Sequence, residues 1–163
     1  MIILGIDPGT ATTGFGVIKR SGDEKITAVD YGCIKTKPGT AAGERLKILN
    51  RELGKLIKKY QPDVLAVERL FFFKNLKTAM PVSEAKGVIL FTAAKNKIPT
   101  YEFTPSQVKM TVAGYGKAEK KQVQKMVKNL LNLEEIPKTD DAADALGIAL
   151  CYLFQARSKI KTI

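Results

Sequence analysis

Hydrophobic residues in the first part of the chain fall into short runs separated by polar turns. Residues 2–6 form a continuous apolar run that ends at Asp-Pro-Gly-Thr, where proline and glycine force a turn, and this pattern predicts a buried central strand. Residues 14–18 and 26–35 are separated by the polar residues 21–24 and predict two more strands joined by a hairpin. We therefore expect the chain to open with three antiparallel strands.

The remainder of the chain alternates between helical and strand patterns. Apolar residues recur at helical spacing over residues 43–60, and Pro62 ends that helix. A loop that contains Gly114 and Gly116 precedes a basic helical segment. The other predicted strands cover residues 64–68 and 100–103, and the other predicted helices cover residues 83–95, 118–131 and, beginning at Thr139 or Asp140, the stretch to about residue 157.

The length and composition indicate one domain. The chain has 163 residues, of which 45% are hydrophobic, and this is enough for one compact domain with a full core. Strands that alternate with helices after an antiparallel opening predict an α/β fold, with a mixed sheet flanked by helices. We assign residues 1–158 to this domain and residues 159–163 to a flexible tail.

The charge of the chain points to a polyanionic partner. There are 27 Lys and Arg residues against 16 Asp and Glu residues, which gives a formal net charge of +11. Nucleic acid is therefore the first candidate partner. The sequence shows neither a secretion signal nor an apolar stretch as long as a membrane span requires, so we expect a cytoplasmic protein.

Two residue types restrict the chemistry. The sequence contains no histidine, which excludes histidine-based triads and the usual zinc hydrolases. Cys33 and Cys151 match no metal-binding or redox spacing, and we expect both to be buried small residues in a reducing compartment. Any metal site must therefore be built mainly from carboxylates.

Four carboxylates are placed to form such a site. Asp7 comes directly after a predicted buried strand and Glu68 is the last residue of another, while Asp141 and Asp144 are three residues apart on one face of the last predicted helix. The alanines and glycine around that acidic pair are small enough to let the helix lie close to a sheet. An all-oxygen site suits Mg²⁺ or Mn²⁺, and a cluster that holds two ions is the standard arrangement for phosphodiester cleavage.

Each acid taken alone has a simpler interpretation. Asp7 could cap the turn that follows it, and Glu68 could be a surface residue at a strand end. Asp140 and Asp141 could stabilise the start of a helix through its dipole. Asp144 lies deeper in an apolar helix and fits that explanation poorly. The set of acids supports a metal site better than any single member does.

Several short motifs follow one another along the chain. They are Ile3-Leu4-Gly5-Ile6-Asp7-Pro8-Gly9, Thr13-Gly14-Phe15-Gly16-Val17-Ile18, Gly32-Cys33-Ile34, Val67-Glu68, Ala85-Lys86-Gly87-Val88, Gln107-Val108-Lys109, Ala118-Glu119-Lys120 and Asp141-Ala142-Ala143-Asp144-Ala145-Leu146. In these motifs the chain resembles the RuvC family of bacterial Holliday-junction resolvases, over nearly its whole length.

The resemblance implies a fold and an activity. It implies a ribonuclease-H-like fold with a mixed five-stranded sheet, and a homodimer that makes paired symmetric nicks in four-way DNA junctions during recombination and repair. It also implies two Mg²⁺ ions in each active site, with Mn²⁺ as a substitute, and contact with the RuvA-RuvB branch-migration complex. The expected enzyme is a metal-dependent crossover junction endodeoxyribonuclease.

The resemblance also assigns residues. The catalytic and metal-binding acids fall on Asp7, Glu68, Asp141 and Asp144, although the neighbouring Asp140 leaves the register of the third acid open. Phe71 matches an aromatic residue that the family inserts among junction bases, although it could instead pack in the core. The other expected DNA contacts are Lys74, Lys109, Lys117, Lys120 and Lys121. Lys117, Lys120, Lys121, Lys125 and Lys128 are expected to cluster on one basic helix.

Three other functions remain possible from the sequence. The turn after the first strand also resembles the phosphate-binding hairpin of the sugar-kinase, actin and Hsp70 ATPases, but those proteins need two such domains. A nuclease of the same fold could trim structured RNA. A catalytically silent junction-binding protein is disfavoured, because it would gain nothing from concentrating negative charge where phosphate must approach.

Overall fold

A five-stranded mixed sheet forms the centre of the protein in the computed structural model, which describes residues 1–22, 25–69 and 76–156. The strands lie in the order β3-β2-β1-β4-β5. β1 pairs antiparallel with β2 and parallel with β4, so the predicted mixed sheet is confirmed. The strands are β1 (Ile2–Asp7), β2 (Thr12–Arg20), β3 (Ile26–Lys35), β4 (Val64–Glu68) and β5 (Thr100–Phe103).

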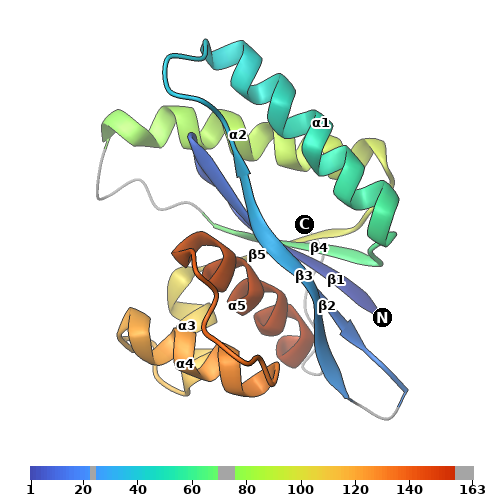
Figure 1. The fold of residues 1–163 in the computed structure, drawn as a ribbon, viewed down its shortest axis with the longest axis vertical. Helices are drawn as coiled ribbons and strands as arrows, with labels where there is room; N and C mark the ends of the chain where they lie inside the picture. The colour runs from blue at the N-terminus through green and yellow to red at the C-terminus, as the bar shows by residue number, and fades with distance from the viewer. Residues whose placement is uncertain (23–24, 70–75, 157–163) are drawn as a thin grey trace.

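Helices cover both faces of the sheet (Figure 1). α1 and α2 pack together on one face, while α3, α4 and α5 lie on the other. Successive residues of β1 point to opposite faces, so Ile3 belongs to the core beneath α5 and Leu4 to the core beneath α1. The helices are α1 (Ala42–Tyr60), α2 (Leu76–Lys95), α3 (Pro105–Ala113), α4 (Lys120–Leu130) and α5 (Asp140–Gln155).

Helix α3 was not predicted from the sequence. The helix begins with a capping box, in which the Thr104 side chain accepts a hydrogen bond from the Gln107 backbone N–H and the Gln107 side chain accepts one from the Thr104 N–H. Pro105 occupies the first turn, and Gly114 ends the helix in a left-handed conformation. The sequence therefore contained capping signals for a helix, Thr104-Pro105-Ser106-Gln107 at its start and Gly114 at its end. The apolar residues between these ends, however, follow the helical period only weakly.

Two other helices begin at positions that differ from those predicted from the sequence pattern. α2 starts at Leu76 rather than residue 83 and contains Pro81. Proline removes one backbone hydrogen bond there, and the buried Ala85 and Ile89 hold the helix against the core. α4 starts at Lys120 rather than residue 118, so Lys117 lies before the helix and not on it.

Helix α5 lies unusually close to the sheet because glycines face it. A Cβ atom built on Gly5 would collide with the Ala145 backbone carbonyl, and one built on Gly14 would collide with that of Asp141. Small residues on the helix contribute as well, since Ala149 also contacts Gly5. Gly147 instead faces Val108 and Val127, on the side of α3 and α4. The expected close approach of this helix to the sheet is confirmed.

We predict that Gly14→Ala destabilises the protein by about 1–3 kcal/mol, because the added methyl group pushes the start of α5 away from β2. Urea unfolding of the variant and the wild type measures the difference. Gly54→Ala is the matched control, since Gly54 lies in α1 with no atom near the position of its Cβ, and it should stabilise the helix by about 0.5–1 kcal/mol. A Gly14→Ala variant as stable as the wild type would contradict this packing.

Candidate active site

The sheet register brings the first two acids together. Ile6 pairs with Val67 across the parallel strands β1 and β4, so Asp7 and Glu68 follow at neighbouring positions at the same ends of these strands. Asp7 pairs with Gly14 on its other side. A Cβ on Gly14 would lie 3.0 Å from the Cβ of Asp141, so this acid stands next to the end of β1.

Burial and mutual repulsion perturb these carboxyl groups. Burial first, and then the nearby Glu68, Asp144 and Asp141 in that order, together raise the pKa of Asp7 to about 8. Burial also raises the pKa of Glu68 to about 7, with a contribution from Asp144. The pKa of Asp144 is raised mainly by its own burial. Asp7, Glu68 and Asp144 therefore form one electrostatically coupled group, and the charge of Asp141 also acts on Asp7 and Asp144.

Two lysines stand beside the acids. The Lys120 Nζ lies 3.1 Å from Asp144 Oδ2 and 3.2 Å from Asp140 Oδ2, and it lowers the pKa of Asp7, Glu68 and Asp144. Lys109 lowers the pKa of Glu68. Glu68, Lys109, Lys120 and Asp144 line one cleft between β4, α3, α4 and α5.

The structure separates Asp140 from the coupled acids. The Gln124 Nε2 donates a 2.8 Å hydrogen bond to Asp140 Oδ1, and this bond together with Lys120 lowers the pKa of Asp140. Asp140 is exposed, whereas Asp141 is half-buried and contributes to the raised pKa of Asp7. This placement favours Asp141 as the third acid of the site.

A buried ion pair next to Glu68 was missed from the sequence. The Lys86 Nζ of α2 lies 2.5 Å from Glu102 Oε1 of β5, and the two side chains are only 13% and 14% exposed. Arg69 binds the other oxygen of Glu102 at 3.2 Å. Lys86 also lowers the pKa of Glu68. A lysine within the otherwise small and apolar run of residues 85–90 was the available signal.

The donor set fits a hard divalent cation. Carboxylate oxygens are the ligands that Mg²⁺ and Mn²⁺ prefer. The pKa values of Asp7 and Glu68 are raised by burial and then by repulsion from neighbouring acids, and a bound cation would offset both effects. Among residues 1–22, 25–69 and 76–156, however, no three acids lie close enough together to ligate a single ion. The side chains of the acids would therefore have to move closer together around a bound ion.

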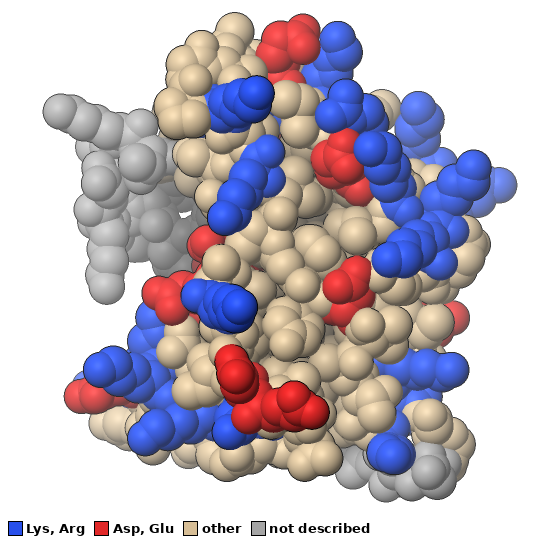
Figure 2. All heavy atoms as spheres, in the orientation of Figure 1, with Lys and Arg blue, Asp and Glu red and all other residues tan. Residues whose placement is uncertain are grey.

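The structure places the other predicted residues in different settings. Phe71 and Lys74 lie outside the described residues. Lys117 lies just before α4 and Lys121 lies on it, and both side chains are exposed. Figure 2 shows Lys and Arg side chains gathered in this region and over α1. Lys121, Lys125 and Lys128 recur at helical spacing along α4, while Lys120 turns toward the acids.

The two cysteines differ in burial. Cys151 is fully buried, as expected, and burial raises the pKa of its thiol to about 11. The expectation for Cys33 was wrong, because this residue on the edge strand β3 is only half-buried. Its Sγ lies 3.2 Å from the Thr139 hydroxyl, just before α5.

None of the helices in the described part of the chain has the length and apolarity that a membrane crossing requires.

Comparisons with known proteins are consistent across sequence and structure. The family model described as "Crossover junction endodeoxyribonuclease RuvC" matches residues 3–152. Proteins with that description from Alkaliphilus metalliredigens and Caldicellulosiruptor saccharolyticus are 53% and 50% identical to the chain, and the alignments cover 99% and 97% of it and 100% and 95% of the relatives.

Solved structures show the same similarity. Thermus thermophilus RuvC in complex with a Holliday junction substrate superposes with a TM-score of 0.93 at 35% identity, over 100% of this chain and 99% of that one. The yeast mitochondrial Holliday junction resolvase Ydc2 superposes with a TM-score of 0.64 at 18% identity, over 95% of this chain and 80% of that one, and shows the fold alone.

Proposed function

Because the chain belongs to the RuvC family of crossover junction endodeoxyribonucleases, we propose that it resolves four-way DNA junctions by paired symmetric nicks. The ribonuclease-H-like fold supports this proposal. The observation that carries it is the gathering of Asp7, Glu68, Asp141 and Asp144 around the ends of β1 and β4, beside Lys109 and Lys120.

We assign a role to each group of residues in the site. Asp7, Glu68, Asp141 and Asp144 would hold two Mg²⁺ ions, or Mn²⁺ as a substitute. Bound ions would supply Lewis-acid activation of water and charge neutralisation at the scissile phosphate. Lys109 and Lys120 would contact phosphate oxygens of the strand being cut. Lys120 must then exchange its carboxylate partners for phosphate as the acids bind cations.

The same proposal extends to partners and setting. Two active sites are needed for symmetric nicks on opposite strands, so we propose a homodimer as the functional unit. Exposed lysines of α4, Lys121 among them, and the neighbouring Lys117 would add sequence-independent contacts to the junction arms. We propose that the protein works in the cytoplasm, in recombination and repair, together with the RuvA-RuvB branch-migration complex.

The test is a cutting assay with three substrates. The purified protein is incubated with a mobile four-way DNA junction, a matched duplex and a structured RNA, each with Mg²⁺ and with EDTA. Paired symmetric nicks on the junction alone, abolished by EDTA, are expected. Trimming of the RNA without junction cutting would replace this proposal with an RNA nuclease, and junction binding without any cutting would indicate a silent binder.

We predict that Lys120→Met shifts the acid limb of metal-dependent cutting to higher pH. Lys120 lowers the pKa of three acids, so its removal raises their pKa and leaves fewer of them ionised at a given pH. Cutting at pH 6.5 should fall by about tenfold, with a smaller loss at pH 8.5. Lys121→Met is the control, because Lys121 is exposed on the same helix; an equal shift in both variants would contradict this role of Lys120.

A further inference from the structure

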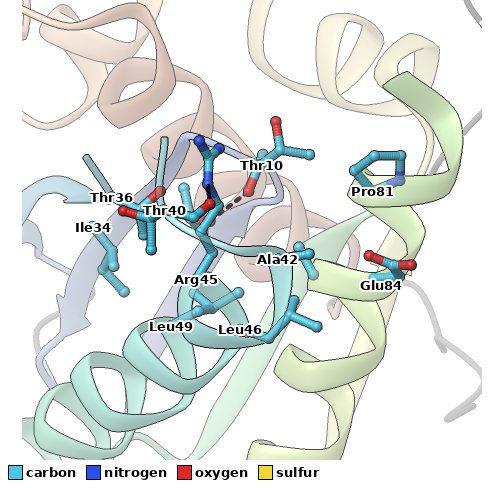
Figure 3. A pocket seen from close by; sticks show the side chains of 13 residues that line it. Thr10, Ile34, Thr36, Thr40, Ala42, Arg45, Leu46, Leu49, Pro81 and Glu84 are labelled. Atoms are coloured by element: carbon cyan, nitrogen blue, oxygen red, sulfur yellow. Dashed lines mark hydrogen bonds between the residues drawn. The ribbon is translucent and has the colours of Figure 1, made fainter. Parts of the chain in front are cut away.

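A second cavity opens on the face of the sheet that α1 and α2 cover (Figure 3). It has a volume of about 290 Å³ and lies between the turn after β1, the end of β3 and the facing sides of α1 and α2. We call it the Thr10 pocket, after the threonine at its mouth. Its floor is apolar and is formed by Ile34, Leu46, Leu49 and Ala85.

The rim of the Thr10 pocket carries donors and acceptors on opposite sides. The Arg45 Nε donates a 3.0 Å hydrogen bond to the Thr40 carbonyl, and this bond holds the guanidinium at the mouth beside Thr10. Glu84 of α2 lies across the pocket from Arg45. Thr36 and Thr40 add hydroxyl groups to the rim. A flat apolar body with hydrogen-bonding groups on its edges matches this arrangement.

A nucleobase has this chemistry. Unpaired bases are held in proteins by apolar contact with their faces and by hydrogen bonds to their edges. An arginine can donate to base carbonyl or ring nitrogen acceptors, and a carboxylate can accept from base amino groups. The volume is at the lower end for ligand pockets, which suits a single ring system. A phosphate alone would meet Glu84 and an apolar floor, and both would disfavour it.

The Thr10 pocket lies next to the candidate active site. Thr10 is three residues from Asp7, and three residues of extended chain span at most about 11 Å. The turn that carries Gly9 and Thr10 therefore joins the pocket directly to the acid at the end of β1. A nucleotide close to the scissile phosphate is within reach of this pocket.

We propose that the Thr10 pocket receives one unpaired base of the strand being cut, within a few nucleotides of the scissile phosphate. The proposal rests on the proposed junction-cutting function. Arg45 and Glu84 would bind the edge of the base, while Leu46 and Ala85 contact its face. The pocket would thereby position the strand and make cutting depend on which base stands at that place.

The test is a scan of abasic sites through a junction. Each nucleotide within three positions of the cut is replaced in turn by an abasic nucleotide, and the rate of cutting is measured at saturating protein. Wild-type cutting should fall about tenfold at one position and change little at the others. Arg45→Gln and Glu84→Gln should cut the intact junction about tenfold more slowly and should be insensitive to the abasic site at that position.

The matched controls remove one positive and one negative charge from exposed positions of α1. Arg51→Gln and Glu44→Gln, whose side chains are 62% and 60% exposed, should keep the wild-type dependence on position. A wild-type scan without any sensitive position would overturn the proposal. So would an Arg45→Gln variant that keeps the wild-type pattern.

A binding measurement separates this proposal from the proposed function. If the wild type cuts no intact junction, NMR titration with each of the four free deoxynucleosides decides the question. Shifts confined to Thr36, Thr40 and Leu46, lost in Arg45→Gln but kept in Arg51→Gln, would uphold base binding. Absence of shifts at millimolar concentrations would overturn it.

Discussion

Asp7→Asn reduces junction cutting by about 10³-fold or more, while junction binding stays the same or becomes tighter. The substitution replaces a charged oxygen ligand at the centre of the coupled acids by a neutral amide, so the site binds cations less well. The amide adds no negative charge to the place where phosphate approaches, and binding therefore does not suffer. Single-turnover cutting with Mg²⁺ and gel-shift binding in EDTA measure the two effects.

The neighbouring aspartates provide the controls for this prediction. Asp141→Asn should lose cutting as Asp7→Asn does, whereas Asp140→Asn should retain most of it, because Asp140 is held by Gln124 and Lys120 on the exposed side. The reverse result for the two variants would move the third ligand to Asp140. Loss of junction binding in a folded Asp7→Asn protein would contradict the metal-site assignment altogether.

The stability of the metal-free protein falls as the pH rises from about 5 to 8. The pKa of Asp7 is raised from 3.8 to about 8 and that of Glu68 from 4.5 to about 7, so the folded state holds protons that the unfolded state has released. Their contribution to stability is complete below pH 4 and is lost as the pH approaches 8. The loss should reach several kcal/mol, at about 1.4 kcal/mol for each pKa unit.

Urea unfolding in EDTA at several pH values tests this dependence. Asp7→Asn should flatten the curve and should be more stable than the wild type at pH 8, because a neutral amide has no ionisation penalty in the same site. Mg²⁺ at pH 8 should stabilise the wild type more than the variant, since cations bind the folded acids. If the stability of the wild type does not change between pH 5 and 8, the ionisation of Asp7 does not cost stability, and the raised pKa of this group is contradicted.

The sheet and the first two acids could be predicted because apolar runs end in turns. The runs before Asp7 and Glu68 are continuous and short, which identifies central strands, and parallel neighbours bring their ends together. Helix α3 was missed because its apolar residues, among them Val108 and Val112, follow a weak pattern. In that segment only the capping residues identify the helix.

Other features of the site depend on packing that the sequence pattern does not contain. A change of one residue rotates a side chain by about 100° around a helix, and the sequence favoured Asp141 over Asp140 only through its three-residue spacing to Asp144. The packing of Gly14 against α5 adds the position of Asp141 next to the end of β1. The Lys86–Glu102 ion pair joins residues of α2 and β5, and the Thr10 pocket joins four segments. Contacts between distant segments of this kind require the tertiary arrangement.

The position of α5 in the chain has a consequence for synthesis in the cell. Asp7 and Glu68 are made early, but Asp144 follows Glu68 by 76 residues, which a ribosome adds in about 4–15 seconds. During that interval the nascent protein carries only half of the acid cluster, and the sheet lacks the helix that covers one of its faces. With the metal site as proposed, a growing chain would have no nuclease activity, and cutting would become possible only when the last helix docks against Gly5 and Gly14.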